Sequence, residues 1–209
     1  MPKPFLYLEG GKRLFDVITS AMAIVLVMPL MVIIAAMIAV SSPGGFLFRQ
    51  TRVGKNRRVF TILKFRTMVV GADRLGPGIT REHDPRITPI GRFLRRYKLD
   101  ELPQFINVLR GDMSLVGPRP ELPLYVEEFP EKFEAILNVR PGITDLASIA
   151  YRNEEDLLEL AEDSEVAYRN VVLPSKLSLN LDYVRQVSFS YDLKLLLRTA
   201  AVLPRRSGT

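Results

Sequence analysis

The most strongly patterned part of the sequence is a hydrophobic stretch near its N-terminus, residues 17–40, which contains 24 residues and no charged side chain. An α-helix rises about 1.5 Å per residue, so a helix of this length measures about 36 Å and can cross a bilayer core of about 30 Å. A cleaved signal peptide fits less well, because the stretch is longer than the apolar part of such a peptide and residues 41–43 form a poor cleavage site. The pattern therefore predicts a helix that enters a membrane.

Two features of this stretch argue against a simple transmembrane span. Pro29 lies in its middle, where a proline removes one backbone hydrogen bond and favours a kink. Basic residues flank it on both sides, with Lys12 and Arg13 before it and Arg49 and Arg52 after it. The positive-inside rule therefore assigns neither end to the outside. A kinked span and a helix that bends at Pro29 and returns to the same membrane face both agree with the pattern.

Beyond residue 44 the pattern changes to shorter elements. Residues 46–54 and 57–68 alternate apolar and polar side chains around a Gly54-Lys55-Asn56 turn, which predicts a β-hairpin. Residues 89–96 place apolar side chains at helical spacing opposite three arginines. This arrangement predicts an amphipathic helix that lies on an anionic surface.

A further predicted helix has two carboxylates at its start. In residues 98–114, Pro103 fits only the first helical turn and Gly111 suits the C-cap, so Asp100 and Glu101 lie at the N-terminal end. Residues 114–123 read as a proline-rich bend. More helices are predicted at residues 124–137, 154–163, 176–186 and 192–203. The expected fold class is α+β and mostly helical, with a membrane helix, a small hairpin and amphipathic interfacial helices around one compact domain.

Composition and charge narrow the chemistry. The 209 residues include no cysteine and one histidine, His83, so disulfides, thiolate metal sites and Cys/His nucleophile pairs are excluded. The net charge of +6 indicates a polyanionic partner, which could be nucleic acid, an anionic membrane surface or a phosphorylated substrate. Residues 44–98 hold 14 Lys and Arg against 3 Asp and Glu, whereas residues 99–165 hold 5 against 16. A basic half therefore meets an acidic half near Asp100.

Asp100 and Glu101 stand at this junction. Adjacent helical residues point about 100° apart, so these carboxylates do not face each other across a bond, but the positive end of the helix dipole keeps both ionised. An ionised aspartate can serve as a nucleophile or a magnesium ligand, although acidic residues are also common at helix starts without any such role. Nearby cations favour the chemical role, because phosphoryl transfer needs positive charge around phosphorus. These cations are Arg92, Arg95, Arg96, Lys98, Arg110 and Arg119.

Phosphates would have to be held by side chains, because the sequence has no Walker-type loop and no G-x-G-x-x-G pattern. Arg119 lies between Pro118 and Pro120, which restrict its backbone and the directions open to its guanidinium. A guanidinium constrained in this way suits a phosphate group.

Four strings, in their order and spacing, resemble the bacterial sugar transferases called monotopic polyprenyl-phosphate glycosyl-1-phosphate transferases, or small phosphoglycosyl transferases. They are KFRTM (64–68), LDELPQFINVLRGDMSLVGPRP (99–120), RPGIT (140–144) and SFSYDLKLLLRT (188–199). The resemblance covers residues 12–200, and its second string is highly specific. It implies transfer of a sugar-1-phosphate from a UDP-sugar to polyprenyl (undecaprenyl) phosphate with release of UMP, which initiates membrane glycoconjugate or polysaccharide synthesis.

The resemblance also implies residue roles. Asp100 would be the nucleophile that forms a phosphosugar-aspartyl intermediate, with Glu101 as its acid/base partner and Mg²⁺ bound near Asp100. The family's membrane helix is re-entrant and broken by a proline, which corresponds to Pro29 and favours the second of the two topologies. The predicted phosphate contacts are Lys64, Arg66, Arg96 and Arg119.

These roles divide the chain in two. Residues 1–43 are expected to form the re-entrant membrane helix and its N-terminal flank. Residues 44–209 are expected to form a catalytic domain with interfacial helices at the cytoplasmic face of the bacterial inner membrane. The domain would contact inner-membrane lipids, and the prediction allows a homodimer.

The sequence departs from the family pattern at three places. Met28 stands where many members have a serine before the proline, residues 145–152 differ from the common GWAQVNGR string, and Asn180 replaces an aspartate, with Asp182 two residues on. Two non-catalytic alternatives are a membrane-anchored nucleic-acid-binding protein and a scaffold for lipid headgroups. No nucleic-acid partner is expected, because the basic half has few aromatic residues for base stacking and the acidic half would repel a phosphate backbone.

Overall fold

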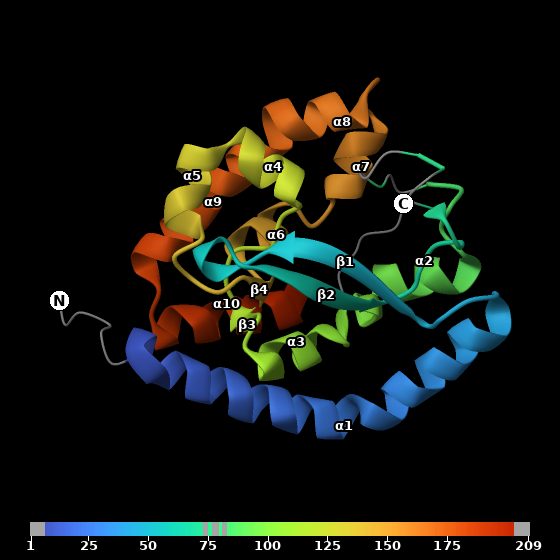
Figure 1. Ribbon diagram of the computed structural model, residues 1–209, viewed down its shortest axis with the longest axis horizontal. Coiled ribbons are helices and arrows are strands. Elements are labelled where there is room, and N and C mark those ends of the chain that lie inside the picture. Colours follow the sequence, from blue (N-terminus) through green and yellow to red (C-terminus); the bar gives the residue numbers. More distant parts are fainter. Residues whose placement is uncertain (1–6, 73–74, 77–79, 81–82, 203–209) are drawn as a thin grey trace.

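The computed structural model describes residues 7–72, 75–76, 80 and 83–202. The chain is mostly helical, with two small two-stranded sheets. A long helix, α1, runs along one side of the molecule, and the remaining elements pack together above it (Figure 1). This arrangement confirms the mostly helical α+β fold and the long apolar helix predicted from the sequence.

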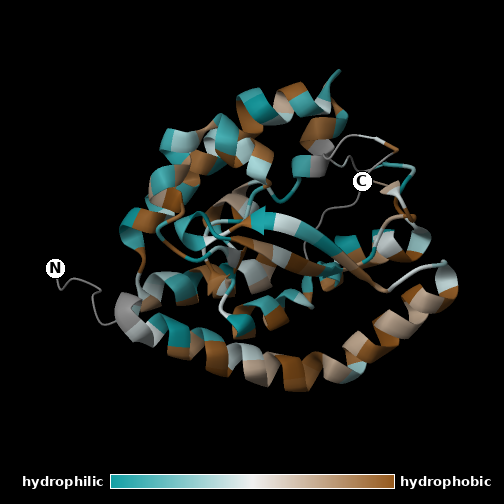
Figure 2. Ribbon diagram, in the orientation of Figure 1, coloured by the Kyte–Doolittle hydropathy of each residue, from teal (hydrophilic) through white to brown (hydrophobic). Residues whose placement is uncertain are grey.

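Helix α1 extends over Lys12–Ser41 and follows a short π-helical turn, Tyr7–Gly11. Pro29 lies inside it, and the helix bends near its middle so that both ends approach the rest of the chain (Figure 1). Among the described residues it is the one helix long and apolar enough to cross a membrane, and only 11% of its most apolar window is buried. Its exposed face is strongly hydrophobic (Figure 2). These apolar side chains therefore need a partner that the folded chain does not supply.

The predicted hairpin is confirmed. Strands β1 (Leu47–Val53) and β2 (Val59–Phe65) pair antiparallel. The turn between them, Lys55–Arg57, contains two residues with positive φ. The hairpin crosses the centre of the molecule (Figure 1). Its side chains Ile62 and Phe65 belong to two different buried apolar clusters.

The helix predicted at residues 89–96 is also present as α2 (Pro89–Arg96), and the side chain of Thr88 caps it by accepting a hydrogen bond from Gly91 N. A 3₁₀ turn (Leu99–Glu101) and α3 (Gln104–Arg110) follow. Gly111 ends α3 in the left-handed conformation expected of a C-cap. Asp100 and Glu101 therefore lie in the 3₁₀ turn that precedes α3, and not in the first turn of the helix itself, as the sequence had suggested.

The prediction of a simple bend at residues 114–123 is wrong in part. Strand β3 (Ser114–Val116) pairs in parallel with β4 (Gly142–Thr144), and α6 (Leu146–Ala150) comes directly after β4. Strands of three residues are too short to show an alternating pattern, and a parallel pair joins segments far apart in sequence. For these reasons neither the two strands nor their pairing could be predicted from the sequence alone.

The single helix predicted at residues 124–137 is in fact two, α4 (Pro123–Glu128) and α5 (Pro130–Ile136). Phe129 leaves the helical conformation because the residue before a proline is sterically excluded from it. The remaining predicted helices are present with shifted ends. They are α7 (Glu154–Glu159), α9 (Leu173–Gln186) and α10 (Phe189–Val202). Helix α8 (Ser164–Ala167) and the π-helical turn at Tyr168–Val172, which lie between α7 and α9, were not predicted.

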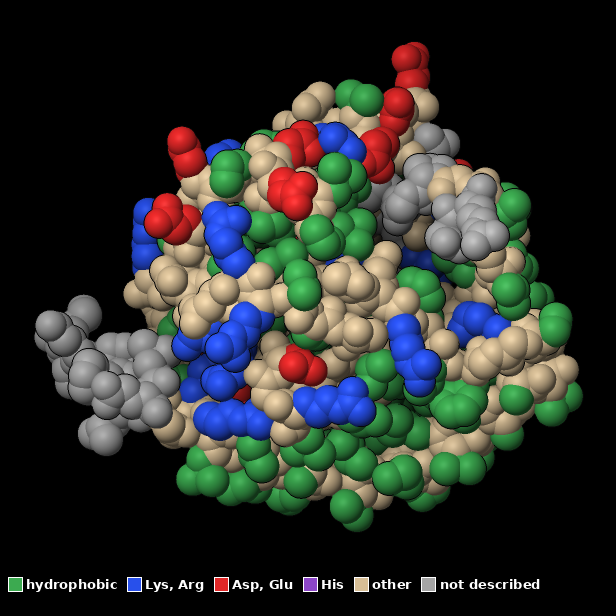
Figure 3. Space-filling model, in the orientation of Figure 1, with side chains coloured by type: hydrophobic (Ala, Val, Ile, Leu, Met, Phe, Trp, Pro, Cys, Tyr) green, Lys and Arg blue, Asp and Glu red, His purple; other side chains and the backbone are tan. Residues whose placement is uncertain are grey.

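Charged and apolar side chains are separated on the surface. Figure 3 shows hydrophobic side chains over α1, Lys and Arg side chains gathered next to that band, and most Asp and Glu side chains at the opposite end, over α4, α5 and α8. The second half of α1 packs on the domain through Ile34 and Ile38, which join a buried cluster with Phe65 and Leu94. The second half of α1 is therefore attached to the rest of the chain by apolar packing.

Candidate active site

A cavity of about 560 Å³ opens between the hairpin, the end of α2 and helices α6, α7, α9 and α10. A volume of this size falls in the range that holds small-molecule ligands. One wall is strongly cationic, and its basic side chains are Lys64, Arg95, Arg96, Lys98 and Arg119. The predicted phosphate contacts Lys64, Arg96 and Arg119 therefore share one cavity, as expected if they bind one anion.

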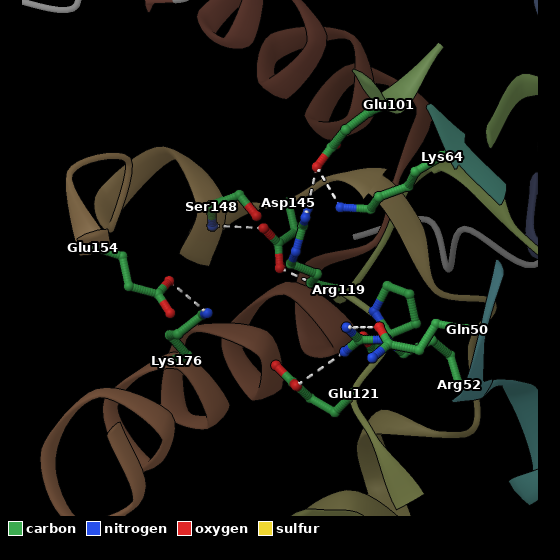
Figure 4. A network of polar contacts seen from close by, with 11 residues as sticks. Gln50, Arg52, Lys64, Glu101, Arg119, Glu121, Asp145, Ser148, Glu154 and Lys176 are labelled. Atoms are coloured by element: carbon green, nitrogen blue, oxygen red, sulfur yellow. Dashed lines mark hydrogen bonds and ion pairs between the residues drawn. The ribbon is translucent and has the colours of Figure 1, made fainter. Parts of the chain in front are cut away.

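Glu101 is held between two of these cations. Its Oε1 atom accepts a 2.6 Å hydrogen bond from Arg119 Nη2 and a 3.1 Å hydrogen bond from Lys64 Nζ (Figure 4). Burial alone would raise the pKa of Glu101, but the charges of Arg119 and Lys64 outweigh it and hold the pKa well below the usual 4.5. Glu101 is therefore ionised near neutral pH.

Asp100 is buried beside this ion cluster, with 7% of its surface exposed. Its Oδ1 atom is buried and has no hydrogen-bond partner among the described residues. Burial raises the pKa of Asp100, and the charge of Lys64 opposes the rise. Its chain neighbour Glu101 lines the cavity, whereas Asp100 itself is not among the described residues that do. The carboxyl of Asp100 is thus buried next to Glu101 of the cationic wall, with one oxygen that has no partner in the described part of the chain.

The local chain conformation explains how these side chains meet. Lys98 adopts a positive φ that turns the chain after α2, and the 3₁₀ turn then carries Asp100 and Glu101 next to Lys64 on β2. Leu99 and Leu102 anchor the turn because they pack on the apolar cluster that contains Leu94. The two leucines that flank the acidic pair therefore fix the direction of both carboxylates.

Arg119 is fixed from its backbone as well as its side chain. Its N–H donates a 2.9 Å hydrogen bond to Asp145 Oδ2, and Asp145 Oδ1 accepts a 2.6 Å hydrogen bond from Ser148 N, which caps α6. The charge of Glu101 raises the pKa of Arg119, so the guanidinium stays charged. Asp145 therefore ties Arg119 to α6, a role that the sequence did not reveal.

Arg52 is a second residue that sequence reasoning did not assign to the site. It lines the cavity, donates to Pro120 O at 3.1 Å and lies 3.7 Å from Glu121. The pairing of Arg52 with Phe60 places it on the same hairpin face as Lys64, because residues two apart on a strand share a face. This strand alternation, applied from Lys64, could have found Arg52.

Other predicted residues lie elsewhere. Arg66 donates hydrogen bonds to Ser42 O and Ser42 Oγ at 3.0 and 2.7 Å, so the structure places it at the end of α1 and not with Lys64. Asn180 is buried on α9, and its Oδ1 atom has no partner among the described residues, whereas Asp182 is partly exposed and lies beside Arg185. Neither Asn180 nor Asp182 belongs to the described lining of the cavity.

The carboxylates near the cavity fit a magnesium ion that would be held mainly by the phosphate groups of the substrate. Among the described residues no group of three or more His, Cys, Asp or Glu side chains is placed to hold a metal. Magnesium in phosphate-binding sites commonly takes one or two protein carboxylates, and phosphates and water complete its shell. The unpaired Oδ1 atom of Asp100 suits the role of such a single carboxylate ligand.

Comparison with known proteins identifies the family to which the chain is similar. A model for the family described as "Bacterial sugar transferase" matches residues 7–206. The chain is 38% identical over 193 residues to the UDP-glucose:undecaprenyl-phosphate glucose-1-phosphate transferase of Escherichia coli K12. The matched region covers 90% of this chain and 39% of that protein. It is 39% identical over 209 residues to the protein of the same name in Caulobacter vibrioides, covering 97% of this chain and 73% of that one.

A relative with another sugar in its name is similar to nearly the same degree. The UDP-N-acetylgalactosamine-undecaprenyl-phosphate N-acetylgalactosaminephosphotransferase of Aeromonas hydrophila is 36% identical over 191 residues, 90% of this chain and 42% of that protein. The chain thus spans about two fifths of the length of two of these relatives and most of the third.

Proposed function

Because the chain belongs to the bacterial sugar transferase family, we propose that it transfers a sugar-1-phosphate from a UDP-sugar to undecaprenyl phosphate and releases UMP. The observation that carries the proposal is the cluster in which Lys64 and Arg119 hold Glu101 beside the buried, partly unpaired carboxyl of Asp100. Relatives that act on undecaprenyl phosphate are named for different sugars, so the proposal leaves the sugar open.

In the first proposed step, a carboxylate oxygen of Asp100 attacks the β-phosphorus of the UDP-sugar. A bond forms between this oxygen and phosphorus, and the bond from phosphorus to the oxygen that bridges the two phosphates breaks. UMP leaves with the bridging oxygen, and the sugar phosphate remains on Asp100 as an acyl phosphate. Lys64 and Arg119 lie beside the carboxylates, where they offset the negative charge on the phosphate oxygens.

In the second proposed step, a phosphate oxygen of undecaprenyl phosphate attacks the same phosphorus. The bond between phosphorus and Asp100 breaks, which restores the carboxylate and gives undecaprenyl diphosphate sugar. Glu101 is ionised between its two cations, so in its proposed acid/base role it would act as the base that accepts a proton from the incoming phosphate. Its two ion pairs also hold Lys64 and Arg119 in fixed positions for both steps.

Asp100 would hold Mg²⁺ through its unpaired Oδ1 atom, together with phosphate oxygens of the substrate. A bound Mg²⁺ supplies positive charge that makes the phosphorus more electrophilic and stabilises the leaving phosphate. The protein's own contribution is the cationic wall formed by Lys64, Arg95, Arg96, Lys98 and Arg119.

We also propose that α1 is re-entrant and that the domain sits on the cytoplasmic face of the inner membrane. Both ends of α1 are tied to the same folded unit, because Arg13 Nη2 donates to Leu109 O at 2.9 Å and Arg66 Nη2 donates to Ser42 Oγ at 2.7 Å. One folded domain cannot lie on both faces of a bilayer, so this pairing supports a helix that enters and leaves by one face. Basic side chains next to the apolar band suit contact with anionic lipid headgroups (Figure 3).

The function is tested by incubating the purified protein with a panel of UDP-sugars, undecaprenyl phosphate and Mg²⁺ and measuring UMP. We expect UMP release with at least one donor in the presence of acceptor. Without acceptor, we expect at most one UMP per protein and a mass increase equal to one sugar phosphate on the peptide that contains Asp100. Absence of UMP with every donor would overturn the proposal, and sustained release without any adduct would overturn the covalent step.

A further inference from the structure

The cavity has a second polar end, formed by Glu154 at the start of α7 and Lys176 on α9. Lys176 Nζ donates a 2.8 Å hydrogen bond to Glu154 Oε2. Figure 4 shows this pair apart from the cluster of Glu101, Lys64 and Arg119, with Ser148 and Asp145 between them. The proposed chemistry uses neither member of the pair.

Lys176 is unusually buried for a lysine, with 6% of its side chain exposed, whereas Glu154 retains 25%. Burial of an ammonium group is unfavourable unless its donors are satisfied. An ammonium group has three N–H donors. In the described part of the chain, Lys176 Nζ bonds to Glu154 and lies 5.3 Å from the centre of the Tyr168 ring. The group therefore has remaining donor capacity, and it lies in the wall of the cavity.

The charges of the two ends differ. Around Glu101 the cavity is lined by five basic side chains, which suits a diphosphate. At the other end, Lys176 pairs with Glu154 and Arg52 lies 3.7 Å from Glu121, and Arg152 also lines the cavity. A surface on which an ammonium donor is paired with a carboxylate acceptor selects an anion less strongly than the unevenly charged end around Glu101. It matches groups that donate and accept hydrogen bonds without carrying charge, as hydroxyls do.

We propose that Glu154 and Lys176 form a polyol subsite that binds the uncharged, hydroxyl-bearing part of the nucleotide sugar. This inference rests on the proposed function for the identity of the substrate. Hydroxyl groups would donate to the Glu154 carboxylate and accept from Lys176 Nζ, and Tyr151, which also lines the cavity, offers a ring for an apolar face of the sugar. Two parts of a UDP-sugar have this chemistry, the transferred hexose and the ribose. A subsite for the hexose would determine sugar specificity, whereas a subsite for the ribose would determine nucleotide affinity.

The test uses Lys176→Met and Glu154→Gln, which remove one charge each at similar size. Glu128→Gln is the matched control, because it breaks the Arg169–Glu128 ion pair, which lies outside the cavity. Values of kcat and KM for UMP release are measured with UDP-glucose, UDP-galactose and UDP-N-acetylglucosamine, together with the inhibition constant of UDP. Thermal midpoints show whether each variant folds. If Lys176→Met does not fold, Lys176→Arg and Glu154→Gln, whose side chain is more exposed, are compared with wild type instead.

We expect KM to rise by about tenfold or more in both cavity variants and to stay unchanged in the control. If the loss differs among the sugars while the inhibition constant of UDP is unchanged, the subsite holds the hexose. If the inhibition constant rises in step with KM, equally for every sugar, the subsite holds the ribose. Values of KM and of the UDP inhibition constant within twofold of wild type in a folded variant would overturn the inference.

Failure of the proposed function would look different from failure of the subsite. In that case the wild-type protein would release no UMP from any donor. Calorimetric binding of the same UDP-sugars and of UDP to wild type and Lys176→Met would still test the subsite. Equal dissociation constants for both proteins would then overturn it.

Discussion

The guanidinium of Arg119 donates a 2.6 Å hydrogen bond to Glu101, so the second of two adjacent carboxylates is paired while an oxygen of the first, Asp100, has no partner among the described residues. The two side chains therefore experience opposite environments although they are neighbours in sequence. Burial raises the pKa of Asp100, whereas the charges of Arg119 and Lys64 overcome burial and lower that of Glu101. Environments that push two pKa values apart are typical of carboxylates with separate chemical roles.

The first prediction concerns the nucleophile. Asp100→Asn should reduce sugar-phosphate transfer by at least about a hundredfold, because the change keeps the shape of the side chain and removes the charged oxygen that attacks phosphorus. The thermal midpoint should not fall, because the buried oxygen that is replaced makes no hydrogen bond in the described part of the chain. Transfer at more than about a hundredth of the wild-type rate would remove Asp100 from the role of nucleophile.

Arg119→Lys should also be damaging although it keeps the positive charge. A guanidinium can bond to Glu101 and to a phosphate oxygen at once, whereas an ammonium group lacks the planar fork that permits this geometry. We expect kcat/KM to fall by about tenfold or more. Arg169→Lys is the matched control, since Arg169 pairs with Glu128 outside the cavity and should keep normal kinetics. Near-normal kinetics for Arg119→Lys would assign Arg119 a structural role.

The raised pKa of Asp100 predicts a pH dependence of the rate. The nucleophile must be ionised, so kcat/KM should fall as pH decreases through the pKa of Asp100, which lies above the usual 3.8. Glu101 stays ionised over the same interval because its pKa is lowered. The charge of Lys98 lowers the pKa of Asp100, so Lys98→Met should move the acid limb to higher pH. An acid limb at or below 3.8, or one that Lys98→Met does not move, would contradict this assignment.

Much of the candidate site could be predicted from the sequence, because its residues lie in segments with strong local patterns. Asp100 and Glu101 precede a helix marked by Pro103 and Gly111, and Lys64 lies in an alternating strand. What could not be predicted depends on contacts between distant segments. Arg119 is held by Asp145, and Lys176 by Glu154, and no local pattern links the members of either pair.

The fold shows the same division. The hairpin and α2 were predicted close to their observed limits, since each has a clear period and a turn or a cap. The β3–β4 pair was missed, because its two strands of three residues meet across α4 and α5. Such pairing is decided by packing of the whole chain, and local propensity contributes little to it.

Close packing at the β3–β4 pair gives the fourth prediction. A Cβ atom on Gly142 would lie 2.1 Å from Gly117 N, and Gly142 N donates a 3.0 Å hydrogen bond to Pro118 O, directly before Arg119. Gly142→Ala should therefore force the two backbones apart and destabilise the protein by about 1–3 kcal/mol or more. It should also lower kcat/KM by displacing Arg119. Gly45→Ala is the control, because no atom lies within 4 Å of its Cβ position. A thermal midpoint for Gly142→Ala equal to that of the control would show that the strands can separate without penalty.

The last prediction concerns the course of α1 in the membrane. Arg13 near its start bonds to the end of α3, and Ser42 just past its end bonds to Arg66, so both ends belong to one face of the bilayer if the domain stays folded. The native chain has no cysteine, and Gly10 and Gly45 both have open space around their Cβ positions, so single cysteines can be placed there. We expect Gly10→Cys and Gly45→Cys to be protected from an impermeant thiol reagent in intact spheroplasts and labelled in inverted membranes.

Labelling of Gly10→Cys in spheroplasts, with Gly45→Cys protected, would show a transmembrane span and rule out the re-entrant helix. Pro29→Ala should shift the labelling in that direction, because it restores a backbone hydrogen bond and favours a straight helix of 30 residues, which is long enough to cross. The shift must break the contacts of Arg13 with the domain, so it should be accompanied by loss of activity. Unchanged accessibility in Pro29→Ala would mean that these contacts at the two ends of α1, and not the proline, maintain the bend.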